Sequence, residues 1–308
     1  MISPLAYVDP SAKLGNNVEV KPFAYIDKNV TIGDNCVIMP YASIMEGTTM
    51  GSGNKVYQHA VIGAEPQDFH HVPGTRSAVI IGNDNCIREN VVIAGGTDPD
   101  TATVIGNGNF LMDKVHICHD AHIHNRCVLG IGVSVAGNCE IFDCSIQSSG
   151  AMIQQHVRVG KFSLVQSGCR VQHDVPPYAI LGGNPAAYHG VNAVILQHEG
   201  LTERILRHIA NAYRLVYTGN FSLEDAVIKI GEQIPASIEI DEIVSFIKAA
   251  KHGIVRNRKA DDSLRHIPPN PYRAKHSVCA WPVFLRCLIR KSRFYEIIVV
   301  ILHKGGFY

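Results

Sequence analysis

The sequence of 308 residues predicts an all-β coil of short parallel strands, followed by a small α-helical C-terminal domain. Three patterns indicate this: an aliphatic residue at every sixth position, a small residue four positions after many of them, and helical spacing near the end. A helix has a period of 3.6 residues and a flat strand a period of 2, so a period of six fits a short strand and a tight corner. We expect the β domain over residues 1–189, the helical domain over 190–256 and a basic tail over 257–308.

The six-residue repeat runs through nearly the whole β domain, and only Gln147 in the series is polar. The repeat pauses at residues 64–80 and 94–104, which we predict to be loops that leave the coil. Loops on a rigid scaffold are where functional residues usually lie. The aliphatic positions are Ile2, Val8, Leu14, Val20, Ile26, Ile32, Ile38, Ile44, Met50, Val56, Ile62, Ile81, Ile87, Ile93, Ile105, Leu111, Ile117, Ile123, Leu129, Val135, Ile141, Ile153, Val159, Val165 and Val171.

Three helices are expected after the β domain. Hydrophobic residues recur at helical spacing over 201–216, with Thr202 as the N-cap and Gly219 as the stop. Ser222 and the aspartate three residues later resemble a capping box that opens a second helix, which ends before a proline. A third helix is expected over about residues 238–251.

The charge of the chain is unevenly distributed. Residues 256–308 hold 11 Lys and Arg against 3 Asp and Glu, whereas residues 1–255 hold 17 against 24. An acidic body argues against nucleic acid as the main partner. The basic tail is expected to be poorly ordered, and the alternative is a segment that binds a membrane or a protein.

Cysteine usage and hydropathy indicate a cytoplasmic protein. Nine cysteines are scattered without a CxxC pair, which is typical of free thiols in a reducing compartment. The first residues show no secretory signal. The longest late apolar run, residues 297–302, is far shorter than the roughly 20 residues that a transmembrane helix needs. We therefore expect no transmembrane segment.

The segment HICHDAHIH, residues 116–124, concentrates four histidines. The repeat directs Ile117 and Ile123 into the core, so His116 and His122 face outward on different sides of the coil. We expect these two histidines to be solvated or to lie at a subunit contact. His119 falls near a corner instead.

Residues 18 positions apart stack on adjacent coils, about 4.8 Å from each other. His119 therefore stacks with Gly137 and then Gln155, while Asp120 begins the neighbouring column and is followed by Asn138. A histidine base, an adjacent carboxylate and an exposed backbone N–H are the parts that acyl transfer to a hydroxyl requires. The sequence thus predicts an acyl-transfer site at this corner.

A metal site is the alternative for this segment. The spacing of His119 and His124 resembles that of the gamma-class carbonic anhydrases, which are also hexapeptide-repeat coils. Those enzymes need a third histidine about two coils earlier, and the sequence near residue 83 has none. A catalytic zinc usually has three protein ligands, so we expect no metal here.

Several stretches resemble one family in particular: AEPQDFH, IREN, GNGNFLMDKVHICHD, HDVPPYAILGGNPA, GVN and IANAYRLVY. Over residues 1–256 the chain is similar to the UDP-N-acetylglucosamine O-acyltransferases. The resemblance implies a left-handed parallel β-helix and a homotrimer with active sites between subunits. It also implies transfer of a (3R)-3-hydroxyacyl group from acyl carrier protein to the 3-hydroxyl of UDP-N-acetylglucosamine, the first step of lipid A synthesis. The protein would need no metal or redox cofactor, because phosphopantetheine arrives on the donor protein.

The resemblance also implies roles for single residues. His119 would be the general base, Asp120 would orient it, and the Gly137 N–H would stabilise the oxyanion. Asp68 would bind the acyl 3-hydroxyl, unless it is an ordinary solvated loop carboxylate. Ser167 would set the length of the acyl tunnel, unless it is a small packing residue of the repeat.

The sugar nucleotide would contact Gln155, Asn192, Asn138 and His198. This side of the site departs from the family pattern, since Glu199 stands where a basic residue near the phosphates is expected. Losing cations should weaken pyrophosphate binding. Three alternatives remain open: another acceptor for the same chemistry, a zinc enzyme similar to the gamma-class carbonic anhydrases, and a scaffold without activity.

Overall fold

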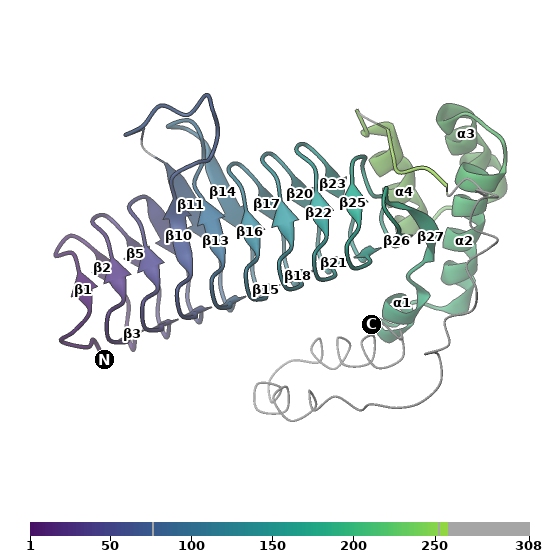
Figure 1. Cartoon of the computed structure of the whole chain (residues 1–308). Coiled ribbons are helices and arrows are strands. Elements are labelled where there is room, and N and C mark those ends of the chain that lie inside the picture. Colours follow the sequence, from purple (N-terminus) through teal and green to yellow (C-terminus); the bar gives the residue numbers. More distant parts are fainter. Residues whose placement is uncertain (76, 252, 258–308) are drawn as a thin grey trace, which may run out of the picture.

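A computed structural model describes residues 1–75, 77–251 and 253–257. The expected tail at 257–308 lies, apart from Asn257, outside the described residues. The described chain is a left-handed parallel β-helix of three sheets that ends in a small group of helices (Figure 1). The predicted fold class is therefore confirmed.

The three sheets form the three faces of the coil, and each turn of the coil adds one strand to each face. Face 1 consists of β1 (Tyr7–Val8), β4 (Tyr25–Ile26), β7 (Ser43–Ile44), β10 (Val61–Ala64), β13 (Val92–Ala94), β16 (His116–Ile117), β19 (Ser134–Val135), β22 (Met152–Ile153) and β25 (Arg170–Val171). Face 2 consists of β2 (Lys13–Leu14), β5 (Thr31–Ile32), β8 (Thr48–Met50), β11 (Ala78–Ile81), β14 (Ala102–Ile105), β17 (His122–Ile123), β20 (Glu140–Ile141) and β23 (Arg158–Val159).

Face 3 also carries the last two strands before the helices. It consists of β3 (Glu19–Val20), β6 (Val37–Ile38), β9 (Lys55–Val56), β12 (Cys86–Ile87), β15 (Phe110–Leu111), β18 (Val128–Leu129), β21 (Ile146–Gln147), β24 (Leu164–Val165), β26 (Ala179–Gly182) and β27 (Ala187–Val191). β27 pairs with β26 in the antiparallel direction, unlike the parallel strands before it. The sequence did not predict this hairpin, and the expected domain boundary at residue 189 falls inside β27.

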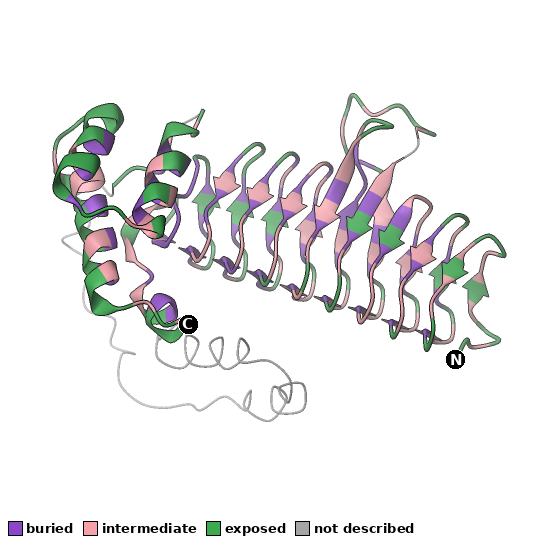
Figure 2. Cartoon of the chain, turned by 180° about the vertical axis from the view of Figure 1, so that it is seen from behind, coloured by how far each residue is buried: buried purple, intermediate pink, exposed green. Residues whose placement is uncertain are grey.

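The aliphatic repeat fills the interior of the coil, and Figure 2 shows buried residues alternating with intermediate or exposed ones along the strands. Ile38, Ile62 and Ile117, for example, are completely buried. Most neighbouring strands pair residues that are 18 apart, such as His116 with Ser134, as the sequence predicts. The polar exception, Gln147, is also completely buried, between Leu129 and Val165 of the adjacent coils.

The two predicted loops interrupt this regular stacking on the same side of the coil. The first connects β10 to β11 and the second connects β13 to β14, and Figure 1 shows both projecting from the coil. After the loops, β11 pairs with β14. A buried ladder of asparagines joins the coils before and after the loops. In this ladder Asn85 Nδ2 donates to Asn54 Oδ1 at 3.0 Å, and the Asn109 amide donates to Asn85 Oδ1 at 2.9 Å.

In the described part of the chain, four helices follow the β-helix: α1 (Ala193–His198), α2 (Glu203–Thr218), α3 (Leu223–Gln233) and α4 (Ile238–Lys248). The predicted caps are confirmed, because Thr202 caps α2, Gly219 ends it, and Ser222 caps α3. The third predicted helix is α4, which ends three residues earlier than expected. The short helix α1 was not predicted.

The helices pack on the outside of face 3 at the C-terminal end of the coil. Val128 and Leu164, which point outward from face 3, share one buried cluster with Ile209 and Tyr213 of α2. The Tyr213 hydroxyl donates to the carbonyl of Pro177 in the β-helix. The helical part is thus held against the coil by a hydrophobic core of its own.

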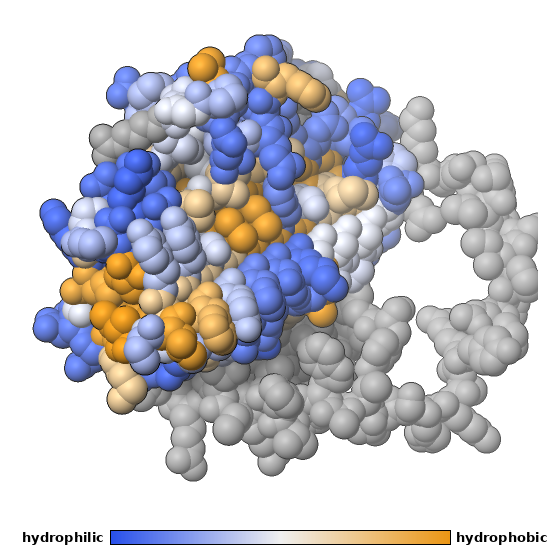
Figure 3. Space-filling model, turned by 60° about the vertical axis from the view of Figure 1, so that its left-hand side comes forward, coloured by the Kyte–Doolittle hydropathy of each residue, from blue (hydrophilic) through white to orange (hydrophobic). Residues whose placement is uncertain are grey.

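The N-terminal end of the coil carries exposed apolar and aromatic side chains. Figure 3 brings this end forward and shows hydrophobic residues on its surface. Tyr7 and Tyr25 stack on face 1 with ring centroids 5.0 Å apart, and Phe23 stacks on Tyr41 at the corner at 5.2 Å. All four are exposed.

Two further expectations concern membranes and thiols. Among the described residues, no helix is long and apolar enough to cross a bilayer. The seven cysteines of the described part are all free thiols. Burial raises the pKa of Cys127, Cys139 and Cys144 to about 12, so these thiols are small core residues rather than nucleophiles.

Candidate active site

The site is built on the corner that follows β16. His119 and Asp120 form this corner, where Asp120 has a positive φ of 57°, a conformation that aspartate tolerates better than most residues. The turn directs the His119 imidazole along the coil axis instead of into the core. His119 is nevertheless 7% exposed, because the next coil and the first loop cover it.

Gly137 lies directly on the next coil, as the predicted stacking requires. The Asn138 amide donates to the His119 carbonyl at 3.1 Å, which joins the two corners. A Cβ atom on residue 137 would lie 2.4 Å from Cε1 and 2.5 Å from Nε2 of His119. Only glycine leaves room for the imidazole here. The Gly137 N–H donates to no group among the described residues, so it is available to a ligand.

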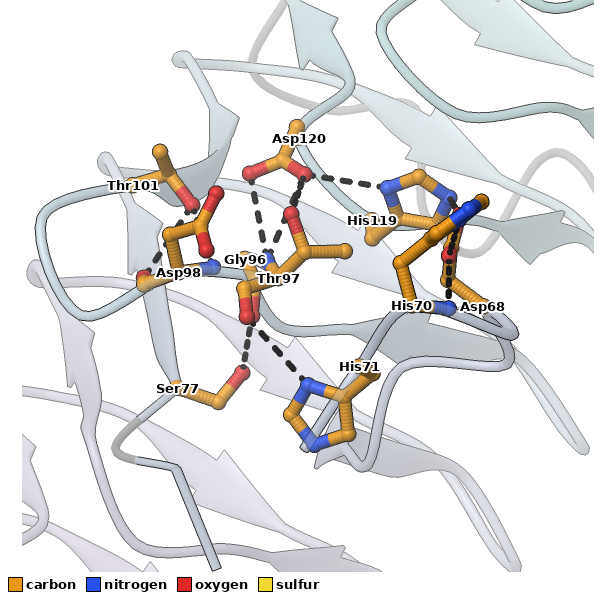
Figure 4. Close-up of polar contacts among 10 residues, drawn as sticks. All are labelled: Asp68, His70, His71, Ser77, Gly96, Thr97, Asp98, Thr101, His119 and Asp120. Atoms are coloured by element: carbon orange, nitrogen blue, oxygen red, sulfur yellow. Dashed lines mark hydrogen bonds and ion pairs between the residues drawn. The ribbon is translucent and has the colours of Figure 1, made fainter. Parts of the chain in front are cut away.

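Each nitrogen of the His119 ring contacts a carboxylate (Figure 4). Nδ1 lies 3.0 Å from Asp120 Oδ2, and Nε2 lies 3.3 Å from Asp68 Oδ2. The sequence predicts the first contact, because the two residues are adjacent. The second joins residues 51 positions apart and depends on the path of the first loop.

The second loop fixes Asp120 through Thr97. The Thr97 hydroxyl donates to Asp120 Oδ2 at 2.8 Å, and the Thr97 amide lies 3.3 Å from the same oxygen. Burial of the Asp120 carboxylate opposes ionisation, but the hydrogen bonds from threonine and histidine neighbours outweigh it. The pKa of Asp120 is therefore held below its usual range. Asp120 therefore stays an anion, which can accept a hydrogen bond from a protonated His119 Nδ1.

The two loops are also bonded to each other. The Ser77 hydroxyl donates to the Gly96 carbonyl at 2.8 Å, and His71 Nδ1 lies 3.3 Å from the Thr97 carbonyl. The His71 side chain is 4% exposed, so it belongs to the interior of this loop pair. Sequence reasoning missed Thr97, His71 and Ser77, since no short motif marks contacts between the loops.

Asp68 opens a small turn in the first loop. The His70 amide donates to Asp68 Oδ1 at 2.7 Å, and His70 Nδ1 lies 3.0 Å from the same atom. The backbone hydrogen bond from His70 is the main cause that lowers the pKa of Asp68. Oδ2 is left to face His119. The adjacent Phe69 is fully exposed to solvent.

The remaining predicted site residues are dispersed over one chain. Asn138 and Gln155 are exposed at the same corner as His119, on the next two coils. Ser167 is exposed at the corner between β24 and β25, so it is not a core residue of the repeat. Asn192 and His198 lie at the helical end.

Asn192 and His198 differ in exposure. The Asn192 side chain is buried and donates to the Phe162 carbonyl at 2.9 Å, which ties the start of α1 to the coil. His198 ends α1 and is exposed. Glu199 lies 3.7 Å from Arg126, so a cation does accompany this carboxylate. A single chain therefore brings together His119, Asp120, Gly137 and Asp68, with Asn138 and Gln155 further along the same corner and the other predicted residues elsewhere.

His124 is not part of this site. Its ring stacks on His122, with centroids 4.1 Å apart, and its Nε2 lies 3.1 Å from Glu140. His119 and His124 therefore do not form the zinc-ligand pair that their spacing suggested, because each contacts other residues. The corner has the parts for proton transfer from a hydroxyl and for holding an oxyanion.

Family models match both parts of the chain. The model described as "Bacterial transferase hexapeptide (six repeats)" matches residues 29–64. The model described as "Udp N-acetylglucosamine O-acyltransferase; Domain 2" matches residues 174–255, which include the helices. The coil, the corner site and these matches define an acyltransferase of the hexapeptide-repeat class.

Relatives match nearly the whole described chain. A protein of Burkholderia lata named acyl-(acyl-carrier-protein)–UDP-N-acetylglucosamine O-acyltransferase is 41% identical over 260 residues, which is 83% of this chain and 99% of that protein. The UDP-N-acetylglucosamine acyltransferase structure from Bacteroides fragilis has a TM-score of 0.81 and 46% identity, covering 83% of this chain and 100% of that one. The enzyme from Francisella novicida has a TM-score of 0.80 and 31% identity, covering 88% and 100%. The chain belongs to the family of UDP-N-acetylglucosamine O-acyltransferases.

Proposed function

We propose that this protein transfers a (3R)-3-hydroxyacyl group from acyl carrier protein to the 3-hydroxyl of UDP-N-acetylglucosamine, in the first step of lipid A synthesis. The observation that carries the proposal is the position of His119, between the Asp120 carboxylate and the backbone of Gly137. The names of the relatives supply the donor and acceptor classes. These substrate classes and the free thiols support a cytoplasmic location.

The Asp120 contact sets the tautomer of His119 that the reaction needs. Because Asp120 is an anion, it accepts the Nδ1–H of His119 and leaves the lone pair of Nε2 to act as the base. Nε2 takes the proton of the sugar hydroxyl as its oxygen attacks the thioester carbonyl. The Gly137 N–H then donates to the oxyanion of the tetrahedral intermediate. When this collapses, the C–S bond breaks and the phosphopantetheine thiol leaves with the proton from His119.

Asp68 must give up its contact with His119 before this reaction can begin. Its Oδ2 lies 3.3 Å from Nε2, where the acceptor hydroxyl would have to be. The 3-hydroxyl of the acyl donor offers Asp68 another hydrogen-bond donor. Donor binding would thus move the carboxylate and free the base. The exposed Phe69 beside it offers apolar surface to the acyl chain.

The dispersed residues support a homotrimer. Gln155 and Asn138 line the corner that holds His119, whereas Asn192 and His198 lie at the helical end. A neighbouring copy could bring the second pair, and the acyl tunnel corner with Ser167, to the first. Exposed apolar residues on the outer faces, such as Tyr25, Ile80 and Met152, provide surface for such packing. Light scattering of the purified chain tests this, and a monomer would contradict it.

A sugar without the nucleotide is a second candidate for the acyl acceptor. The negative charge of Glu199 would repel a nucleotide pyrophosphate, which needs a cation instead. Glu199 also lies 3.7 Å from Arg126 and so neutralises part of the positive charge of that side chain. An acceptor with less negative charge than a nucleotide sugar would suit this surface. The same chemistry at His119 would act on it.

The deciding experiment is an acyl-transfer assay on the untagged full chain. Acyl carrier proteins loaded with 3-hydroxyacyl groups of several lengths are offered with UDP-N-acetylglucosamine, and in parallel with the sugar lacking the nucleotide. Product from the UDP-sugar supports the proposal, and the preferred length tests the role of Ser167. Product from the free sugar alone would favour the second acceptor.

A pair of variants connects the assay to the site. His119→Ala should lower kcat by roughly 10² to 10⁴, the usual contribution of general-base catalysis. His59→Ala, an exposed corner histidine at the N-terminal end, is the matched control and should keep the parental rate. If His119→Ala turns over at the parental rate, the proposed mechanism is wrong.

A further inference from the structure

Face 2 carries three side chains whose ligand atoms converge. His122 lies in β17, His124 follows it, and Glu140 lies in β20 on the next coil. His122 and Glu140 are direct partners in the ladder between these strands. One ligand atom from each residue lies within 4.8 Å of the other two. The corner with His119 and Asp120 uses none of these three groups.

The spacing of these atoms fits one tetrahedral metal ion. With metal–nitrogen and metal–oxygen distances of about 2.0–2.2 Å, two ligand atoms of a tetrahedral site lie roughly 3.3 Å apart. His124 Nε2 and Glu140 Oε1 are already 3.1 Å apart. The rings of His122 and His124 are nearly parallel, with an angle of 17° and centroids 4.1 Å apart. A small movement of His122 would complete the set.

The surroundings hold the carboxylate in place. Arg158 Nε lies 3.8 Å from Glu140 Oε2, the oxygen that does not face His124. The charge of Arg158 is shared with Asp174 at 3.6 Å, and its guanidinium lies over the ring of Phe246 at 4.3 Å. Such second partners orient metal-binding carboxylates in proteins. The aromatic ring of Phe142 stacks on His124 at 4.8 Å and limits its rotation.

We propose that His122, His124 and Glu140 form a binding site for a divalent transition metal of the zinc class. Two imidazoles and one carboxylate favour zinc or its neighbours over magnesium or calcium, which prefer oxygen ligands alone. Three protein ligands leave the fourth position to a solvent molecule or a small anion. The ion would join the coils of β17 and β20.

This site is independent of the proposed acyl transfer. The metal-binding residues lie on face 2, whereas the proposed base, His119, lies at the corner after β16. Both ring nitrogens of His119 contact carboxylates of that corner, from Asp120 and Asp68. A metal here would therefore act on the stability of the coil or on a ligand at face 2, and the acyl reaction would need no metal. The two proposals can fail separately.

Cobalt titration tests the site. The untagged full chain is freed of metal with a chelator and titrated with Co²⁺, whose visible absorption reports tetrahedral coordination, and Zn²⁺ is then added in competition. We expect one Co²⁺ per chain, displaced by Zn²⁺, and a higher melting temperature with Zn²⁺ than without. No tetrahedral absorption would overturn the proposal.

Substitutions locate the ion. His124→Gln and Glu140→Gln keep the approximate side-chain size and should each weaken Co²⁺ binding at least about tenfold, since even the loss of a residue that only hydrogen-bonds to a metal ligand has such effects. His59→Gln tests for adventitious binding to an exposed histidine, and His119→Ala tests for binding at the corner. Both should bind as the parent does. Unchanged binding by both His124→Gln and Glu140→Gln, or loss of binding in His119→Ala, would contradict the assignment.

Discussion

The imidazole of His119 lies against the backbone of Gly137, one coil further along the chain. A methyl group on residue 137 would fall 2.4 Å from the imidazole, inside any allowed contact. The two residues are 18 positions apart, the length of one undisturbed coil. The regular stacking of the β-helix therefore both places the proposed base and leaves the space that it occupies.

Gly137→Ala should displace the His119 ring and lower kcat by about 10², because misplacement by roughly 1 Å can have that effect. The matched control is Gly231→Ala in α3, where an added Cβ meets nothing within 4 Å. That change should instead stabilise the helix by about 0.5–1 kcal/mol. Steady-state kinetics and thermal melts of both variants check this. A fully active Gly137→Ala would show that the contact has no role.

Thr97→Val should lower kcat with little change in KM, because the variant keeps the shape of the side chain but removes the hydroxyl donor to Asp120. A hydrogen bond to a charged group contributes about 1.5–3 kcal/mol, so a loss of at least tenfold is expected. Thr97→Ser keeps the hydroxyl and should recover most of the rate. Equal rates for the valine and serine variants would assign Thr97 a packing role only.

Asp120→Asn should reduce stability at neutral pH and have less effect in acid. The pKa of Asp120 is lowered in the folded protein, so its contribution is present above the unfolded value of about 3.9. It is lost as the pH falls through the lower folded pKa. Urea unfolding of parent and variant at pH 7 and at about pH 3 measures the difference. A gap that widens in acid would contradict the sign of the shift.

Gln147→Leu should raise the melting temperature. Gln147 is completely buried, and its Oε1 has no hydrogen-bond partner among the described residues. Its Nε2 donates to Ser145, whose hydroxyl also donates to the Phe142 carbonyl and so stays satisfied. Removing a buried acceptor without a partner should stabilise the fold by about 1 kcal/mol. Leu129→Gln, one coil earlier, is the reverse change and should lower the melting temperature.

The repeat made the coil predictable because each six-residue unit satisfies the same packing rule. The stacking of His119 and Gly137 followed by counting 18 residues, and the caps at Thr202 and Ser222 followed from local hydrogen bonding. His116 and His122 lie on different faces, as predicted. Short elements without a period, such as α1 and the β26–β27 hairpin, left no comparable pattern.

The rest of the corner depended on contacts between distant segments. Asp68 reaches His119 across 51 residues, and Thr97 reaches Asp120 across 23 residues. Neither loop has a repeat that sets its path, so spacing could not place these side chains. His122 and His124 stack because one lies in β17 and the other just after it. The spacing in the sequence had instead suggested His119 and His124 as a pair.

The length of the β-helix is set by the number of its 18-residue coils. Between the His119 corner and β25 the strands pair residues 18 apart, so lengthening the coil itself by one turn takes 18 residues, whereas an insertion of another size would have to leave the coil as the two loops do. One added turn would move the helical end away from the corner by about 4.8 Å while every strand kept its register. The distance between the proposed base and the helices would therefore change in steps of whole coils.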